Sequence, residues 1–555
     1  MAIKGKDGND RDDDDDRHDS GHDDKEKYVS KMPNRKYAYF RDDQFTVLVT
    51  HSNDPIDDKQ LQEFATAINR MLDPRRDGII EKTPEIITFP GFTDEEIRQN
   101  QDLLSRKKLA PVSKAFSILK CELTGGSRDP ARLLDIVSRL KQQFPRNADD
   151  QQKTVAGLTI QGTSFNWLTN ITSETGGTGG PGGRPSPYFG NRKTAPYHLN
   201  IVNQLQAKNI YGDGEGVDVI ILDTAPCAHE LVAAYKEWRD HPIIATLLGP
   251  KGKLHLYPAP YDELVRLACT SLNDFDFSME NHGSFIAGLI HSIVPRAEIH
   301  LIEVLNEFGV GDMWSFIRGL IKARTEIINP NRPAVFSCSW MLVEPLDDSH
   351  CRHLGETGDL DAEFEQAVLE FSKSDVDTAH MLEFLFGQLF GLGKQAIAAA
   401  GNDARVGDSK RPPARYPAAL SSVKGVGATI NEQLANGKYQ PTVYSNFSES
   451  PNKKGVVIRG IVTFGGEEGE GKGVLGLYLG EFPDCSCNES KWAWWCGTSF
   501  ATPIVAGAVA SILSRPRNNI IRTQDAIKKL YGPGVKIIKE GKAGKQEDAL
   551  PVTQS

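Results

Sequence analysis

The sequence predicts an α/β protein in which a parallel sheet with helices on both faces follows a smaller α/β domain. Residues 217–223, VDVIILD, are almost continuously apolar, as expected of a strand buried on both faces of a sheet. Strand-like runs after it alternate with helix-like stretches, which is typical of βαβ units and a parallel sheet. A Gly/Pro-rich stretch at 171–194 marks a linker between the two domains.

Length and composition limit the possible classes of protein. A chain of 555 residues is long enough for two folded domains plus tails. Hydrophobic residues make up 39% and charged residues 25%, as in soluble globular proteins. The net charge of −10 argues against a nucleic-acid partner, because binding phosphates requires a basic face. No apolar run reaches about 18 residues, so we expect no membrane span.

The two ends of the chain are polar. Residues 1–35 are rich in Asp and cannot bury enough apolar surface to offset their ordering entropy, so we expect a disordered acidic tail. Calcium capture by Asp12–Asp16 is the alternative, although consecutive carboxylates repel one another and no loop fixes them. The N-terminus lacks the apolar core of a secretory signal, which predicts a cytoplasmic location. Residues 536–555 form a second polar tail.

Residues 36–170 are predicted to form the smaller α/β domain, for which a ferredoxin-like arrangement is the candidate. Apolar positions with the periodicity of strands alternate with positions spaced as on helices. The strand-like stretches are 45–51, 78–89 and 116–123, and the helix-like stretches are 57–72, 94–109 and 129–144. No catalytic motif lies in this domain, which leaves two roles open: an inhibitory pro-segment, or a permanent recognition or regulatory domain.

Residues 195–535 are predicted to form the larger domain. Its strand-like stretches are 217–223, 298–305, 334–340, 395–401 and 423–429, and its helix-like stretches are 284–293, 312–328, 362–371 and 497–513. In a parallel sheet, functional groups collect at the carboxyl ends of the strands. Asp223 and Asn402 follow strands, whereas His282 and Ser499 open helices. We therefore expect these four side chains to meet at one edge of the sheet.

The four residues have complementary chemistry. A serine hydroxyl becomes a nucleophile when an imidazole takes its proton, and a carboxylate holds that imidazole in the required tautomer. Ser499, His282 and Asp223 supply these groups. The side-chain amide of Asn402 and the backbone N–H of Ser499 are candidate donors to the oxyanion of a tetrahedral intermediate. Pro503 is tolerated in the first turn of a helix, which predicts a helix that begins near Ser499.

Three motifs carry a specific resemblance. The segments VDVIILDTA, NHGSFIAGLIHSIVPRAEIHLIEVL and GTSFATPIVAGAVA resemble the aspartate, histidine and serine motifs of the subtilisin-like serine peptidases, and AAAGND around Asn402 matches as well. The order Asp, His, Ser is that of subtilisin. The resemblance spans roughly residues 195–515 and implies a catalytic triad of Asp223, His282 and Ser499, with Asn402 in the oxyanion hole. It departs from the family at Phe285, where the family usually has a second histidine.

The resemblance also implies a substrate and a binding edge. A peptide or protein substrate would bind in extended form as an added strand beside Ser337, Ser339 and Trp340, and Gly401 is a further candidate binding residue. No cofactor is required and no metal ligands are identified, although family members often bind structural calcium.

The function predicted from the sequence is a serine endopeptidase that works through an acyl-enzyme. The alternative is a non-catalytic or weakened subtilisin-fold protein that acts as a binding module. An α/β-hydrolase esterase would place its serine in Gly-x-Ser-x-Gly, whereas Ser499 lies in Gly-Thr-Ser-Phe-Ala.

Overall fold

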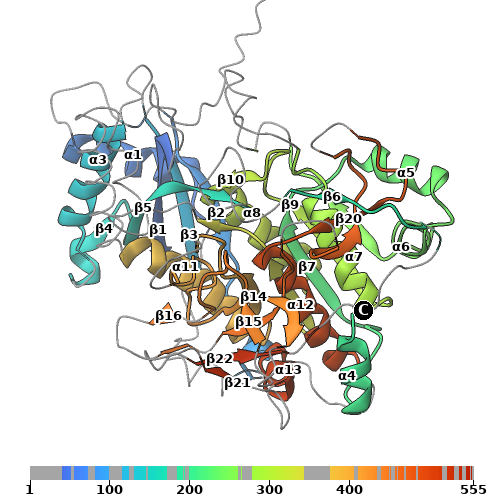
Figure 1. Cartoon of the computed structure of the whole chain (residues 1–555). Coiled ribbons are helices and arrows are strands. Elements are labelled where there is room, and N and C mark those ends of the chain that lie inside the picture. Colours follow the sequence, from blue (N-terminus) through green and yellow to red (C-terminus); the bar gives the residue numbers. More distant parts are fainter. Residues whose placement is uncertain are drawn as a thin grey trace, which may run out of the picture.

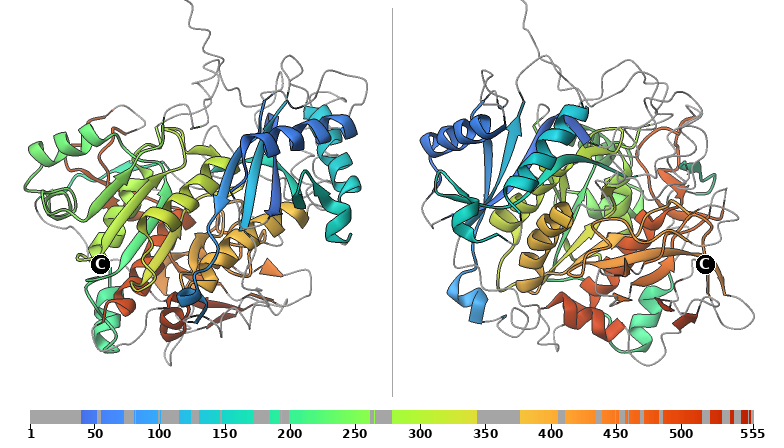
Figure 2. Two further views of the ribbon diagram at one scale, coloured as in Figure 1. Left: turned by 180° about the vertical axis from the view of Figure 1, so that it is seen from behind. Right: turned by 90° about the vertical axis from the view of Figure 1, so that its left-hand side faces the viewer.

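A computed structural model describes the chain between residues 40 and 552, with breaks of which the longest are 101–114, 172–183, 265–277 and 343–375. Two large sheets organise the described residues (Figure 1). The N-terminal strands, drawn in blue, form an antiparallel sheet at one side of the molecule. A mostly parallel sheet built from later strands forms the other side, and Figure 2 shows the same division from behind and from the side. This α/β architecture confirms the predicted fold class.

The main N-terminal elements follow the order βαββαβ, and helical residues 94–98, part of the helix predicted at 94–109, lie between the second and third strands. The main elements are β1 (Phe40–His51), α1 (Asp58–Leu72), β2 (Glu85–Phe89), β3 (Ala115–Glu122), α3 (Pro130–Gln143) and β5 (Leu158–Asn170). Neighbouring strands lie in the order β5-β1-β3-β2, and all three pairs are antiparallel. This is the split βαβ arrangement of ferredoxin-like folds, as expected from the sequence. Helix α1 buries Leu61, Phe64, Ala65, Ile68 and Leu72 because these positions recur on one face at helical spacing.

The parallel sheet contains the strand that carries Asp223. Its strands are β7 (Asp218–Asp223), β8 (Leu254–Tyr257), β9 (Glu298–Glu303), β11 (Ala334–Cys338), β13 (Ala396–Ala399), β14 (Lys424–Gln433), β18 (Ile461–Phe464) and β22 (Gln546–Ala549), with β15 (Tyr439–Pro441) and β21 (Ile537–Lys539) antiparallel to their neighbours. The described neighbour order is β21-β22-β18-β14-β13-β11-β7-β9-β8. Every residue of β7 is buried, as the apolar run VDVIILD predicts.

Helices cover both faces of the parallel sheet. On one face lie α7 (His282–Ile293) and α12 (Thr498–Leu513), which pack against each other and against the sheet. On the other face lie α8 (Met313–Lys322) and α11 (Val376–Gly391), and both of them also contact β5 of the N-terminal sheet. Helices α8 and α11 therefore join the two sheets.

The remaining elements are short. They are η1 (Asp150–Lys153), β4 (Thr154–Val155), β6 (Ser186–Pro187), α4 (Ile201–Ala207), α5 (Ala228–Glu237), α6 (Pro242–Leu247), β10 (Val310–Asp312), η3 (Ala323–Ile327), β12 (Met341–Leu342), β16 (Ser450–Pro451), β17 (Val457–Ile458), β19 (Val474–Leu477), β20 (Trp492–Trp495) and α13 (Thr523–Leu530).

Some sequence predictions differ from the structure or lie outside it. Residues 536–555 were assigned to a polar tail, but β21 and β22 lie there, because β22 pairs with β18 and extends the sheet. The acidic tail at 1–35 and the helix-like stretch at 362–371 lie outside the described residues, as does most of the linker. Within the described part of the chain, no helix is both long and apolar enough to cross a membrane.

Strand β5 is the longest strand described and was not predicted. Its C-terminal end leaves the N-terminal sheet and pairs with two strands of the larger domain, β10 and β12. Asn170 lies opposite both Val310 and Met341. The last residues of β5 are therefore held between two strands that come from the region following Asp223 and His282.

Candidate active site

Asp223 is placed by the end of strand β7. Its side chain is buried, and its Oδ1 accepts a hydrogen bond from the backbone N–H of Thr224 at 2.8 Å. The same oxygen lies 2.8 Å from Nδ1 of His282. Because an ionised carboxylate only accepts hydrogen bonds, Nδ1 of His282 carries the shared proton. This contact joins the end of a central strand to the start of α7.

His282 begins α7 at a point where helix and strand approach closely. A Cβ atom on the next residue, Gly283, would lie 2.1 Å from the carbonyl oxygen of Thr224, so only glycine fits there. With Nδ1 of His282 donating to Asp223, the other ring nitrogen, Nε2, remains as an acceptor. It is buried and has no hydrogen-bond partner among the described residues. A buried acceptor in this state is free to receive a proton.

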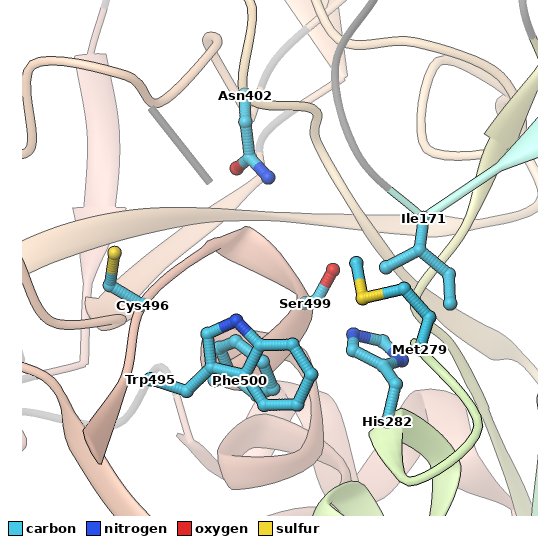
Figure 3. Close-up of a pocket in the computed structure, with 8 residues that line it drawn as sticks. All are labelled: Ile171, Met279, His282, Asn402, Trp495, Cys496, Ser499 and Phe500. Carbon is cyan, nitrogen blue, oxygen red and sulfur yellow. The ribbon is translucent and has the colours of Figure 1, made fainter. Parts of the chain in front are cut away.

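Ser499 lies in the first turn of α12 and lines the same cavity as His282 (Figure 3). Its Oγ donates a hydrogen bond to the carbonyl oxygen of Ser339 at 3.2 Å. The side chains of His282 and Ser499 thus line one cavity, and the hydroxyl of Ser499 is held by the carbonyl oxygen of Ser339.

Pro503 is the sixth residue of α12 rather than a first-turn residue, although the helix begins near Ser499 as predicted. Proline has no N–H, so the carbonyl of Ser499 loses the donor that residue 503 would otherwise provide. The hydroxyl of Ser339 supplies the missing hydrogen bond at 2.9 Å. The side chain of Ser339, just after the end of β11, therefore replaces the backbone hydrogen bond that α12 lacks at Pro503.

Asn402 follows β13 and faces Ser499 across the cavity (Figure 3). Its Oδ1 accepts hydrogen bonds from both the backbone N–H and the hydroxyl of Thr498, at 3.0 and 2.9 Å. These two donors fix which end of the amide is the oxygen, and they leave the Nδ2 donor on the side of the cavity. Gly401 has φ +112°, a conformation that favours glycine, and its N–H donates to the Thr498 hydroxyl at 3.3 Å.

Aromatic side chains enclose the imidazole. Trp495 meets the ring of His282 edge-on, with centroids 5.4 Å apart, and Phe500 lies 5.3 Å away. Phe285, at the position where the family usually has a second histidine, packs against both aromatic side chains instead. This arrangement keeps water away from the Asp223–His282 pair and strengthens their interaction.

The other predicted binding residues, Ser337, Ser339, Trp340 and Gly401, are not among the described residues that line the cavity. Ser337 is buried inside β11, which pairs with strands on both sides, and Trp340 is buried against Phe316 at a centroid distance of 4.1 Å. Pairing with β5 takes place further along, at Met341 and Leu342. Within the expected segment, Ser339 is joined to Ser499 by hydrogen bonds.

Sequence reasoning missed several residues that line the cavity. They are Ile171, Met279, Trp495, Cys496 and Phe500. The run WAWWCGTSF offered a local signal for the last three, since it places aromatic residues directly beside Ser499. Ile171 offered none, because it reaches the cavity only through the pairing of β5. Among the residues that the structure describes, no group of three or more His, Cys, Asp or Glu side chains is arranged to hold a metal ion.

Glu303 is an acidic residue close to the triad whose protonation is unusual. It lies opposite Asp223 in the pairing of β7 with β9. Burial raises its pKa to about 7, the hydrogen bond from the backbone N–H of Ala259 opposes this shift, and the nearby carboxylates of Glu280 and Glu307 add to it. Glu303 therefore changes its charge near neutral pH.

Comparison with known proteins identifies the region that contains the site. Residues 272–531, just under half of the chain, match the sequence model of the subtilase family. This region is therefore similar to the subtilases. The matched range contains His282, Asn402 and Ser499, whereas Asp223 lies before its first residue. The resemblance stated from the sequence motifs is thus confirmed, and the family supports a serine-type peptidase.

One relative extends the similarity beyond that range. The Minor extracellular protease Epr of Bacillus subtilis (strain 168) is 24% identical to this chain over 335 residues. The aligned region is 56% of this chain and 40% of the relative. The chain thus spans well under two thirds of the length of that protease.

Proposed function

We propose that this protein is a serine endopeptidase in which Asp223, His282 and Ser499 form the catalytic triad. The observation that carries the proposal is the 2.8 Å contact between Asp223 and Nδ1 of His282, which leaves Nε2 unpaired in a cavity shared with Ser499. A geometry in which a carboxylate fixes the tautomer of an imidazole beside a serine is the arrangement that acyl transfer requires.

Each residue has a defined role in the proposed reaction. Rotation of the Ser499 hydroxyl away from the Ser339 carbonyl brings it towards Nε2 of His282, which takes its proton as Oγ attacks the peptide carbonyl. Asp223 stabilises the imidazolium that forms. His282 then returns the proton to the leaving amine, and an acyl-enzyme on Ser499 remains. Water, activated by the same imidazole, hydrolyses this ester and regenerates the hydroxyl.

The developing oxyanion is stabilised by Asn402. Its Nδ2 faces the cavity because Thr498 holds its Oδ1. The backbone N–H of Ser499, at the start of α12, is the second donor, and the positive end of the helix dipole acts in the same direction.

Labelling with a fluorophosphonate probe tests the proposal directly. After incubation that allows the cut proposed below, the wild-type chain should be labelled and should hydrolyse a generic peptide substrate, and Ser499→Ala should do neither. Ser292→Ala, which changes a partly buried serine at the far end of α7, is the matched control and should behave like wild type. Equal labelling of Ser499→Ala and wild type would refute the assignment. A wild-type chain that neither reacts nor hydrolyses would favour the non-catalytic binding module.

We further propose that the N-terminal domain is an inhibitory pro-segment. The end of β5 pairs with β10 on one side and β12 on the other, which is how an extended substrate would bind. The pairing continues to Ile171, whose N–H donates to the carbonyl of Gly309 at 3.2 Å and whose side chain lines the cavity beside His282. A peptide in this position excludes any other substrate.

Intact-mass analysis of the full chain tests this second proposal. Incubated wild-type protein should be cut within a few residues after Ile171, and Ser499→Ala should remain intact. Hydrolysis of peptides should rise as the cut accumulates. An active enzyme that stays uncut would instead assign the N-terminal domain to permanent recognition or regulation.

A further inference from the structure

The register of β5 indicates where the residue that precedes the cleaved bond binds. Asn170 lies opposite Met341, so a peptide that keeps this antiparallel register places the residue two positions later opposite Ser339. The carbonyl of Ser339 accepts the hydrogen bond of the Ser499 hydroxyl. That peptide residue would therefore lie next to the nucleophile, with its side chain between the Ser339–Leu342 edge and the Gly401–Asp403 loop, which carries Asn402.

The floor between these two segments is formed by Arg415 and Tyr416. The backbone N–H of Arg415 donates to the carbonyl of Ala400 at 2.9 Å, next to the loop. The carbonyl of Tyr416 accepts from the N–H of Leu342 at 3.0 Å, on the opposite edge. Residues 415 and 416 thus bridge the two walls of the region that receives the substrate side chain.

An ion pair fills this floor. The guanidinium of Arg415 binds both carboxylate oxygens of Asp403 at 3.0 Å, and both side chains are buried. Asn446 donates to the same carboxylate at 2.6 Å. A Cβ atom on Gly401 would lie 3.0 Å from Cγ of Arg415 and 2.6 Å from Nδ2 of Asn446, which shows how little space remains.

The ion pair also resists displacement. If a substrate side chain moved one partner away, the other would be left as an unpaired buried charge, which is strongly unfavourable. Neither Arg415 nor Asp403 lines the cavity that contains Ser499, so the cavity ends before it reaches them. Because the carboxylate of Asp403 and the guanidinium of Arg415 are paired with each other, each charge is already balanced by a buried partner.

We infer that the Arg415–Asp403 pair restricts cleavage to bonds that follow small residues, namely Gly, Ala, Ser or Thr. The chain's own sequence agrees: Ile171 is followed by Thr172 and Ser173, both of which are small. This specificity rests on the proposed peptidase function, and it adds a substrate class that the triad does not define.

Cleavage profiling of a peptide library with the incubated full chain tests the inference. Bonds after Ala or Ser should be cleaved about 10²-fold faster than bonds after Phe. A substrate side chain with even one group too many for its pocket loses about this much in kcat/KM relative to a side chain that fits. A preference for Phe, Leu, Arg or Glu at this position would overturn the inference while leaving the peptidase proposal intact. Absence of both hydrolysis and probe labelling would overturn the peptidase proposal and the inference with it.

A double variant assigns the specificity to the ion pair. Asp403→Ala with Arg415→Ala removes both charges together and should reduce the preference for Ala over Phe at least about tenfold. The matched control is Asp525→Ala with Lys528→Ala, an exposed ion pair on α13 in the larger domain, which should keep the wild-type preference. A folded double variant with an unchanged preference would overturn the role of Arg415 and Asp403. If circular dichroism shows that the double variant is unfolded, the cleavage profile of the wild-type chain alone decides whether the preference for small residues exists.

Discussion

Ser339 and Ser499 exchange hydrogen bonds, each donating its hydroxyl to the carbonyl of the other, at 2.9 and 3.2 Å. The first of these bonds exists because Pro503 cannot donate to the carbonyl of Ser499. The second holds the nucleophile beside the edge where a substrate would pair. One pair of residues thus connects the helix of the nucleophile to the strand end of the substrate cleft.

Removing the Ser339 hydroxyl should destabilise the protein. Ser339→Ala leaves the buried carbonyl of Ser499 without its donor, which should lower the free energy of unfolding by about 1–3 kcal/mol. Pro503→Ala restores an N–H at residue 503, so Ser339→Ala should cost less in that background. Urea unfolding of the four proteins measures the coupling. Equal losses in both backgrounds would show that the Ser339 hydroxyl does not replace the missing helix bond.

Asp223→Asn should lower turnover without unfolding the protein. The amide keeps the size of the carboxylate but can donate to Nδ1 of His282, which favours the wrong tautomer, and turnover should fall about 10⁴-fold. Peptide hydrolysis and probe labelling measure the effect, with circular dichroism as the check on folding. A folded Asp223→Asn variant with near-normal turnover would remove Asp223 from the triad. This test carries particular weight because Asp223 lies outside the residues that match the family.

The main features of the site were predictable because they depend on local signals. An apolar run that ends in Asp223, and helices that begin at His282 and near Ser499, are visible in short stretches of sequence. A parallel sheet then brings such ends to one edge. Periodicity likewise predicted β1, α1, β3 and α3 of the N-terminal domain, whereas β5, which completes its ferredoxin-like order, was not predicted.

The parts that were not predicted depend on pairing between distant segments. Strand β5 reaches the cavity because Thr169 and Asn170 pair with residues at 310–311 and 341–342, and no local pattern encodes that register. The hydrogen bond from Ser339 to Ser499 spans 160 positions in the sequence. The role of Pro503 was misjudged for this reason, since its missing hydrogen bond is replaced from a distant strand end.

Asn402→Ala should reduce turnover more than it affects substrate binding. Loss of one oxyanion donor typically lowers turnover by about 10²–10³-fold, because the charge develops only in the transition state. Thr498→Val, which keeps the backbone donor to Asn402 Oδ1 but removes the hydroxyl donor, should have a smaller effect. Separate measurement of kcat and KM checks both variants. A change in KM alone would show that Asn402 binds the ground state rather than the oxyanion.

Glu303 should make the stability of the fold depend on pH. Its pKa is about 7 in the folded protein against an ordinary value of 4.5, so the folded state holds this proton more tightly than the unfolded state does. The resulting stabilisation is fully present below about pH 4.5 and is lost as the pH rises towards 7. Glu303→Gln retains an oxygen acceptor for the N–H of Ala259 but cannot ionise, so it should flatten this dependence.

Urea midpoints of Glu303→Gln and its parent at pH 5 and pH 7 measure the difference, in a Ser499→Ala background that prevents self-digestion. The variant should gain stability relative to its parent at pH 7 and little at pH 5. Glu63→Gln, which changes an exposed glutamate on α1, should leave the pH dependence of the parent unchanged. If Glu303→Gln shifts both midpoints equally, the carboxyl does not titrate between these pH values, and the burial that raises its pKa must be relieved in solution.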